Sequence, residues 1–432
     1  MIKRLQVKPK GTSTTLKWSK FSMASIACGE GLARICNLAL LVFISRKLGV
    51  QALGAYALAQ ALALYLAQGI DLGLRHIGAG LVASQTGNIC PIVHSVQRKR
   101  IILSIPVILL GYCYGRFGPI PNDARSLVSL YAISMIGYAF SLDWVAWGMK
   151  SFAWMSGWRA AVSFIGLIVT VFSIELFRTG IQIIALGNCL AYFFASYLLW
   201  TLWAKQLLNS KSESSNVPGT TIDWKPVLWM GLAMMANQVF SSIDILILGS
   251  LSTSIQTGLY SAAYRLFLLV LAVYYLIMQS IYPQLAVIPS SRRNFHTLQP
   301  YLGKIACAGI FIAFFMESIR TLLIHMLYGR AFSASIELSM PILLSIPLEL
   351  VASFLLTSII AWGQARVALS ATVIAGISNA ALNIALVPRF GALGSAYATP
   401  ISFCVFLLVL LVCMGSSVSR MHLQDGPLTM PA

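Results

Sequence analysis

Twelve apolar runs of about twenty residues follow one another along this chain, and they constrain its fold more than any other feature. A helix of about twenty residues crosses the roughly 30 Å hydrocarbon core of a bilayer. Because the runs do not alternate polar and apolar residues, they indicate helices rather than the strands of a membrane barrel. The predicted spans are roughly 22–45, 52–74, 101–119, 126–148, 154–176, 181–203, 226–249, 258–285, 302–326, 338–362, 366–387 and 391–414.

The composition requires lipid as the solvent for these runs. Hydrophobic residues make up 58% of the chain and charged residues only 10%, whereas a soluble protein is about 25% charged. Backbone groups in lipid must bond to one another, which helices achieve. We therefore predict an all-α integral membrane protein. The stretch 75–100 mixes apolar and basic residues, and we expect a short surface helix there.

Two stretches about 204 positions apart repeat each other without a gap. Residues 37–67 and 241–271 each consist of an apolar run, a short break containing glycine and a second apolar run, and Gly54 aligns with Gly258. Internal duplication in a membrane chain is typical of transporters built from two lobes with a substrate path between them. We therefore predict two six-helix lobes related by a parallel pseudo-repeat.

The lobe boundaries follow from a polar connection in the middle of the chain. Residues 211–224 lie in a stretch crowded with Ser, Asn, Gly and Pro, which is typical of a flexible linker. The first lobe is expected to cover 1–210, with a basic cytoplasmic tail at its N-terminus. The second is expected to cover 225–432, with a short cytoplasmic tail.

The basic residues predict the orientation of the spans. Of the 30 Lys and Arg residues, twenty fall in segments on the side of the N-terminus, seven fall on the opposite side and three lie within spans. Cytoplasmic segments carry an excess of Lys and Arg, so both termini are expected in the cytoplasm. All ten tryptophans also fall at the cytoplasmic ends of spans. A basic face held against anionic membrane lipids explains the net charge of +18 without a nucleic-acid partner.

Enzyme chemistry has no place in this pattern. The eight cysteines and five histidines are scattered without metal-ligand spacing, so we expect no metal site and no cofactor. The longest connection between spans has about twenty residues and carries no constellation of catalytic carboxylates. A phosphate-binding GxxxxGK[ST] loop is missing from the sequence, so the chain does not hydrolyse ATP itself.

The polar residues inside the spans are the functional candidates, because a charge in lipid costs several kcal/mol unless it is paired or faces water. Most candidates also have a purely structural alternative. Glu30–Arg34 and Glu317–Arg320 also fit pairs that neutralise each other within one helix. Arg265 is long enough to reach the headgroups, and the pair Asn379 and Asn383 also fits a role in joining helices. The candidates for the substrate path are Arg34, Arg265, Arg320, Glu30, Asn237, Gln238 and Glu317. The candidates for a coupling or structural role are Asp244, Glu349, Asn379 and Asn383.

Four motifs in order along the chain resemble a known family. They are RKLG at 46–49 with GAYALA at 54–59 and DLGL at 71–74, then DWVAWGMKSF at 143–152, IDILILG at 243–249 with GLYSAAYR at 258–265, and NAALNIALVPRFGALGSAYAT at 379–399. In these motifs the chain is similar to bacterial polysaccharide-biosynthesis flippases of the multidrug/oligosaccharidyl-lipid/polysaccharide exporter superfamily. It departs from their pattern at Gln238 and Ser241, where a charge would fit the substrate path better.

The resemblance implies a V-shaped exporter that flips an undecaprenyl-diphosphate-linked oligosaccharide across the bacterial inner membrane for O-antigen, capsule or exopolysaccharide assembly. It also implies the polysaccharide polymerase and the chain-length machinery as partners. Arg34, Arg265 and Arg320 would attract the diphosphate, since a guanidinium stays charged and bonds two phosphate oxygens at once.

Two alternatives stay open from the sequence. A cation-coupled drug antiporter of the same superfamily would have the same fold and a cavity dominated by acids, and the three intramembrane arginines argue against it. A membrane enzyme or a scaffold of polysaccharide assembly would instead have paired carboxylates in a pocket, or no central cavity.

Overall fold

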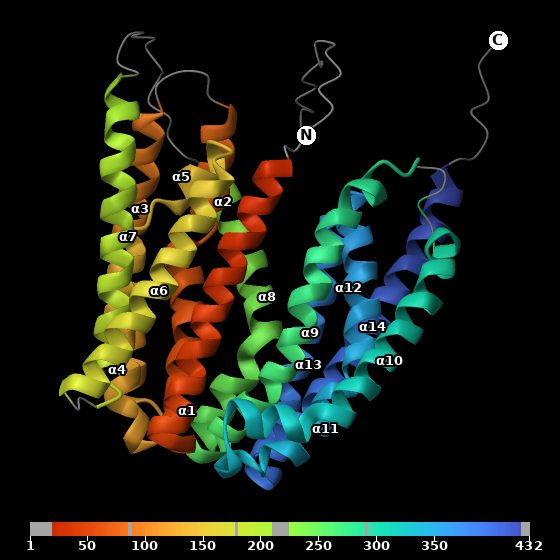
Figure 1. Ribbon diagram of the computed structural model, residues 1–432. Coiled ribbons are helices and arrows are strands. Elements are labelled where there is room, and N and C mark those ends of the chain that lie inside the picture. The colour runs from red at the N-terminus through yellow and green to blue at the C-terminus, as the bar shows by residue number, and fades with distance from the viewer. Residues whose placement is uncertain are drawn as a thin grey trace.

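The computed structural model describes residues 20–84, 89–177, 180–209, 224–289, 293 and 295–424, and the described chain is helical throughout (Figure 1). The basic tail expected before residue 20, nearly all of the linker expected at 211–224 and the last residues of the C-terminal tail lie outside the described residues. Eight described helices are long and apolar enough to cross a membrane, and one bent pair makes nine. The chain is therefore a multi-pass membrane protein.

The first half of the described chain follows the predicted spans with three differences. Its longest helix, α1, covers two predicted spans. The boundary between them is a kink at Gly49, whose φ of 83° suits glycine. The short helix expected within 75–100 forms as α2, and α3 begins at Cys90 rather than at 101. The span expected at 126–148 ends early, at Ala139, and a separate short helix follows. The bounds are α1 Lys20–Asp71, α2 Leu74–Ser84, α3 Cys90–Phe117, α4 Asn122–Ala139, α5 Asp143–Gly148, α6 Phe152–Phe177 and α7 Ile183–Asn209.

The second half contains one bent span. The span expected at 338–362 consists of α11 and α12, which meet at an angle of 42°. Pro341 lies inside α11 and Pro347 begins α12, so the backbone lacks N–H donors on both sides of the bend. The bounds are α8 Trp224–Leu251, α9 Ser254–Ala286, α10 Phe295–Leu327, η3 Arg330–Phe332, α11 Ser335–Leu343, α12 Ile346–Ala361, α13 Ala365–Phe390 and α14 Ala392–Gln424. Counting α1 as two spans and including α4 and α7 makes the twelve predicted helices roughly consistent with the fold.

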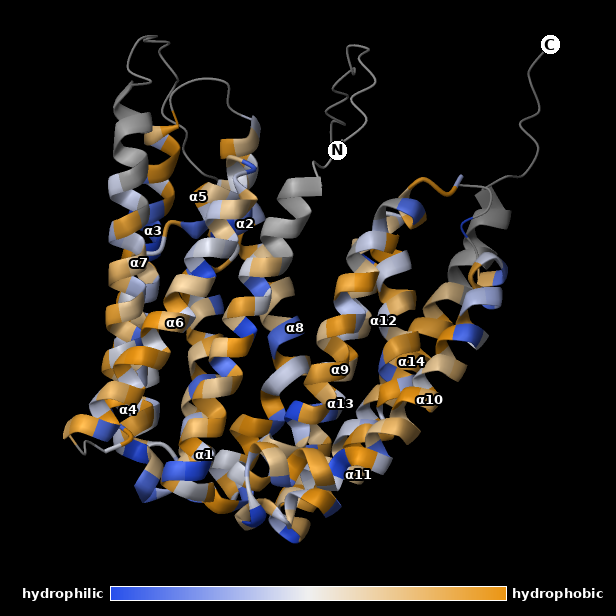
Figure 2. Ribbon diagram, in the orientation of Figure 1, coloured by the Kyte–Doolittle hydropathy of each residue, from blue (hydrophilic) through white to orange (hydrophobic). Residues whose placement is uncertain are grey.

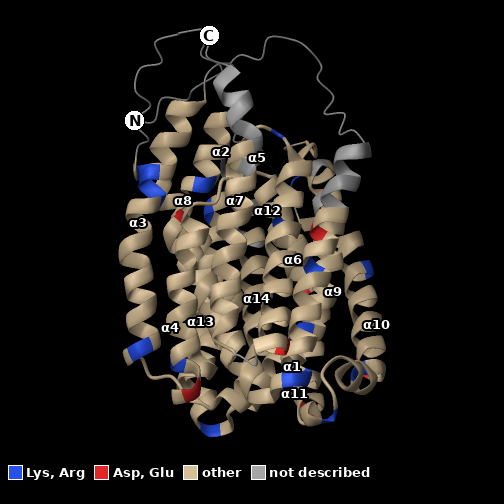
Figure 3. Ribbon diagram, turned by 60° about the vertical axis from the view of Figure 1, so that its left-hand side comes forward, with Lys and Arg blue, Asp and Glu red and all other residues tan. Residues whose placement is uncertain are grey.

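The helices form two groups that converge at one end and diverge toward the end where α1 begins and α14 ends (Figure 1). The groups contain α1–α7 and α9–α14, with α8 between them. Apolar residues colour most of the outward ribbon, and charged residues are few along the helices (Figures 2 and 3). Many large apolar side chains are exposed, such as Ile105 at 67% and Phe314 at 73%. Lipid contact explains this exposure.

The two lobes touch closely at the aligned glycines of the repeat. A Cβ atom added to Gly54 would lie 1.7 Å from the carbonyl oxygen of Ser254, and one added to Gly258 would lie 2.2 Å from that of Val50. The two helices approach this closely only because neither glycine has a side chain. The predicted superposition of the lobes stays a prediction.

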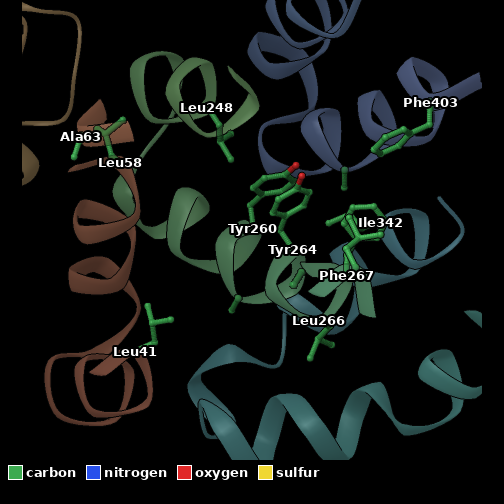
Figure 4. Close-up of a cluster of buried hydrophobic side chains, with 14 of the residues drawn as sticks. Leu41, Leu58, Ala63, Leu248, Tyr260, Tyr264, Leu266, Phe267, Ile342 and Phe403 are labelled. Atoms are coloured by element: carbon green, nitrogen blue, oxygen red, sulfur yellow. The ribbon is translucent and has the colours of Figure 1, made fainter. Parts of the chain in front are cut away.

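A single apolar core runs across this contact. Figure 4 shows Leu41, Leu58 and Ala63 of α1 on one side and Tyr260, Tyr264 and Phe267 of α9 on the other, with Ile342 and Phe403 beyond them. The rings of Tyr260 and Tyr264 are stacked with centroids 5.7 Å apart. The converging end is therefore closely packed by apolar side chains.

Candidate functional site

A polar cavity of about 340 Å³ lies among the helices of the first lobe. Its walls come from α1, α4, α6 and α7, with one residue from α2. Amide, hydroxyl and aromatic side chains dominate the lining, and amides and hydroxyls both donate and accept hydrogen bonds. The polar and aromatic lining residues are Asn37, Tyr56, Gln60, Gln68, Arg75, Tyr131, Tyr138, Ser163, Thr170, Asn188 and Tyr192.

Two amides of the cavity are held by neighbouring hydroxyls. The Asn37 side chain donates to the Ser163 hydroxyl at 3.3 Å, across α1 and α6. The Asn188 side chain donates to the Ser134 hydroxyl at 3.0 Å, across α7 and α4. Each amide keeps an oxygen free of these bonds, so the cavity can bind a polyhydroxyl ligand while its walls stay in place.

Arg34 lies one helical turn before Asn37 on α1, and the two face the same side. Its side chain is exposed and has no carboxylate partner among the described residues. The alternative of a self-neutralising pair with Glu30 on the same helix does not form, because Glu30 instead bonds the guanidinium of Arg159 on α6. Within the described chain, Arg34 therefore keeps an unpaired charge one turn from Asn37, although it does not line the cavity itself.

Arg265 reaches from the second lobe to the same cavity. Its Nη2 donates to the Gln60 Oε1 atom at 2.8 Å, and Gln60 lines the cavity. Its buried Nε has no hydrogen-bond partner, and no carboxylate of the described chain pairs with it. Arg265 thus contacts the wall of the cavity through Gln60, although neither Arg265 nor Arg34 is itself a lining residue.

The remaining candidates for the path lie elsewhere. Arg320 pairs with Glu317 on the same helix at 2.8 Å and donates to the Ile336 carbonyl at 3.1 Å, both within the second lobe. The side chain of Gln238 donates to the Ser242 hydroxyl at 2.6 Å.

Gln238 nevertheless takes part in the contact between the lobes through its backbone. Its carbonyl oxygen accepts a hydrogen bond from the Tyr65 hydroxyl of α1 at 3.2 Å. The neighbouring Asn237 is exposed, and its carbonyl accepts from the Ser241 hydroxyl at 2.7 Å. Neither side chain lines the first-lobe cavity.

Asp244 and Glu349 are buried carboxylates of the second lobe. Asp244 accepts a hydrogen bond from the Tyr260 hydroxyl, and Glu349 accepts from Tyr275 at 2.8 Å and from Ser353 at 2.7 Å. The other carboxylate oxygen of each residue, Oδ1 and Oε2, has no partner in the structure. Each of these two carboxylates therefore has one oxygen without a hydrogen bond.

Asn379 and Asn383 join three helices. Asn379 donates to the Phe240 carbonyl of α8 at 3.2 Å, and Asn383 donates to the Asn379 side-chain oxygen at 2.8 Å. The Ser395 hydroxyl of α14 donates to Asn383 at 2.7 Å. Both side chains are used in holding α13 to its neighbours.

The sequence analysis missed a buried network at the end of the first lobe where α1, α3 and α4 meet. Arg100 is fully buried rather than on a cytoplasmic surface, and its Nε bonds the Asp71 carboxylate at 2.8 Å. Its Nη1 donates to the Ser141 carbonyl at 2.6 Å, and the Tyr138 hydroxyl donates to Asp71. The early end of α4 frees the Ser141 carbonyl, and Arg100 satisfies it.

A second buried pair continues this network toward the cavity. Arg75 bonds Asp143, which is 1% exposed, and Arg75 also lines the cavity. Both Asp71 and Asp143 stand in the motifs of the sequence analysis, at the ends of predicted spans. A carboxylate at such a position next to basic residues is the signal that would have identified both pairs.

Around the cavity, positive arginines therefore outnumber negative carboxylates. Three carboxylates of the first lobe, Glu30, Asp71 and Asp143, are each neutralised by an arginine of that lobe. Arg34 and Arg265 remain without a carboxylate among the described residues. Such a site attracts anions and repels cations.

No family model matches the chain. The chain is 22% identical over 389 residues to a probable low-salt glycan biosynthesis flippase, Agl15, of Haloferax volcanii, covering 84% of this chain and 77% of that protein.

Two solved structures share the fold. One is the lipid II flippase MurJ in an inward closed conformation, with a TM-score of 0.70, 18% identity and coverage of 90% of this chain and 86% of that chain. The other is a multidrug resistance MATE family transporter of the MOP superfamily in an inward-facing conformation, with a TM-score of 0.69, 15% identity and coverage of 94% and 100%. These similar proteins are a flippase of glycan biosynthesis, a lipid flippase and a transporter, and this chain has the two-lobed fold of the MurJ and MATE exporters.

Proposed function

We propose that this chain flips an undecaprenyl-diphosphate-linked oligosaccharide from the cytoplasmic to the outer leaflet of a bacterial inner membrane, for O-antigen, capsule or exopolysaccharide assembly. The observation that carries the proposal is the pair of arginines without a carboxylate near the polar cavity of the first lobe. Arg265 of the second lobe bonds the lining residue Gln60, and Arg34 lies one turn from the lining residue Asn37. A diphosphate supplies the missing negative charge, and a guanidinium bonds it through two oxygens.

The lining of the cavity fits the glycan part of this cargo. Asn37, Gln60, Gln68, Ser163 and Asn188 offer donors and acceptors to sugar hydroxyls. The aromatic faces of the lining tyrosines offer apolar contact to the sugar rings. The isoprenoid chain would stay in the lipid between the diverging helices, so only the polar part of the cargo crosses through protein.

The arrangement of the lobes fits alternating access. The lobes touch at Gly54 and Gly258 and diverge toward the end where α1 begins and α14 ends (Figure 1). With both termini in the cytoplasm, as the distribution of basic residues favours, the open side faces the cytoplasmic leaflet where the cargo is made. Rocking of one lobe on the other about the glycine contact would then open the opposite side.

Asp244 and Glu349 are our proposals for coupling. Each has one carboxylate oxygen without a partner inside a membrane span, and protonation would satisfy it. Asn379 and Asn383, with their bonds between helices, fit the structural role better. The polysaccharide polymerase and the chain-length machinery are the proposed partners.

A drug antiporter of the same fold is the second candidate, and the charges disfavour it. A cationic drug needs an unpaired carboxylate at its site, and every carboxylate of the first-lobe cavity region is bonded to an arginine. Tight binding of a lipophilic cation to the purified protein, retained in Arg34→Ala, would support the antiporter and oppose the flippase.

Export of surface glycan in cells that carry variants of this chain tests the proposal. Arg34→Ala and Arg265→Ala are expected to abolish export while the protein stays inserted and abundant. Lysine at either position keeps the charge and loses the paired bonds, so export should fall only in part. Arg389→Ala is the matched control, because Arg389 is exposed at the end of α13 and lies far along the chain from the cavity lining. Normal export by the Arg34→Ala, Arg265→Ala double variant would refute the proposed path.

A further inference from the structure

A second cavity, of about 670 Å³, lies on the other lobe and has a different chemistry. Helix α12 packs against both α9 and α10, whereas α9 and α10 scarcely touch each other. Their divergence leaves a groove over α12, whose floor consists of the buried side chains of Leu350 and Phe354. The volume lies within the roughly 300–1,000 Å³ of ordinary ligand sites.

The walls of this groove are apolar along most of its length. They come from the last turns of α9, including Met278 and Leu285, and from the first half of α10, including Ile305 and Ile312. The groove therefore lies toward the end of the molecule where α9 connects to α10, which is the end where α1 begins and α14 ends (Figure 1). A straight groove between two membrane helices matches the shape of one hydrocarbon chain.

One cation stands in the wall. Lys304 is exposed, lines the groove and has no ion pair or hydrogen bond within the described residues. Among the described residues, no Asp or Glu lines the groove. The ammonium group is thus uncompensated beside an apolar surface, where an anionic group would be favoured.

The position of Lys304 along α10 indicates which class of ligand the groove binds. Helix α10 has 33 residues, so it is about 50 Å long and exceeds the roughly 30 Å hydrocarbon core. With the helix centred on the core, Lys304, which follows Phe295 by nine residues, lies near the core edge, where its stem can extend to the phosphate level. Ile305 and Ile312 continue from there into the core. A lipid phosphate at the edge and its chain below would match both parts of the groove.

We propose that the α9–α10 groove binds one acyl chain of an anionic glycerophospholipid, with the lipid phosphate on Lys304. A single ammonium group matches the single negative charge of one lipid phosphate. The groove is separate from the cargo site, because on α9 it begins at Tyr274 and Arg265 lies nine residues earlier, about 13 Å along the helix. The inference therefore stands or falls independently of the flippase proposal.

Counting retained lipid on the purified full-length protein tests this site. The wild-type protein in detergent would be incubated with phosphatidylglycerol or phosphatidylcholine and weighed intact by native mass spectrometry. We expect one more retained copy of phosphatidylglycerol than of phosphatidylcholine. Lys304→Ala should remove this copy by loss of charge, and Ala308→Trp should remove it by filling the groove, because Ala308 is an exposed lining residue.

Arg366→Ala is the matched control. Arg366 is also an exposed cation of the second lobe and does not line the groove, so its removal should leave the count unchanged. Unchanged elution and melting of each variant in detergent alone shows that the fold is intact. As a readout independent of mass, phosphatidylglycerol should raise the melting temperature of the wild-type protein and of Arg366→Ala, but not of Lys304→Ala.

Three outcomes would overturn the proposal. They are equal retention of phosphatidylglycerol by the wild-type protein and both groove variants, loss of the copy in Arg366→Ala as well, and displacement of the copy by undecaprenyl phosphate at a lower concentration than by phosphatidylglycerol. The last result would assign the groove to the isoprenoid chain instead.

Discussion

Gly54→Ala is expected to push the two lobes apart at their converging end. The added Cβ would lie 1.7 Å from the Ser254 carbonyl oxygen and 2.7 Å from the Gly258 nitrogen, and real Cβ atoms essentially never approach closer than 3.0 Å. Both neighbours are backbone atoms that cannot rotate away. The helices must therefore separate by about an ångström or more, at the typical overpacking cost of about 1–3 kcal/mol.

The cost can be compared with a matched control on another helix. In a helix interior, alanine is favoured over glycine by about 1 kcal/mol. Gly157→Ala on α6 receives the same gain, and an added Cβ there would meet nothing within 4 Å. The difference between the two variants isolates the clash. If the clash raises the free energy of the arrangement with touching glycines by about 2 kcal/mol, the population of this arrangement relative to one with separated lobes falls about 30-fold.

Spin labels at the converging end would measure this shift. Phe117 at the end of α3 and Met326 at the end of α10 are 77% and 65% exposed, so cysteines there can be labelled in a background without the native cysteines. We expect the distance distribution to move to longer values in Gly54→Ala and to stay unchanged in Gly157→Ala. Glycan export should fall in the first variant only. An unchanged distance distribution together with normal export in Gly54→Ala would refute the reasoning.

The other predictions concern a lobe contact, a buried pair and the orientation. Arg46 donates to the carbonyl oxygens of Leu327 and Met326 across the lobes, so Arg46→Ala should move the label distances in the same direction as Gly54→Ala, and no movement would oppose this contact. Arg100→Met should leave the buried Asp71 charge unpaired and cost about 3–5 kcal/mol, visible as a lower melting temperature in detergent. A melting temperature equal to that of the wild-type protein would contradict the network. Reporter fusions after residue 215 should report the cytoplasm and fusions near 255 the periplasm, and the reverse pattern would invert the orientation.

The sequence by itself determined the class of this protein and, roughly, the number of its membrane spans. The apolar runs have the length that a bilayer demands and leave little freedom, because an unpaired backbone in lipid is too costly. The repeat also aligned Gly54 with Gly258, whereas their contact across the lobes became visible only in the structure. The apolar runs and the repeat are local or are imposed by the solvent, so they can be recognised without tertiary structure.

Only the tertiary structure decided which charges are paired. Glu30 bonds Arg159, 129 positions away, instead of Arg34 one turn along the same helix. Arg100 looks like a surface cation in the sequence, yet the helix end at Ala139 gives it carbonyls to bond and buries it. Spacing along one helix cannot predict such partners, because the choice depends on which helices pack side by side. The excess of arginine at the cavity is therefore a property of the packed fold.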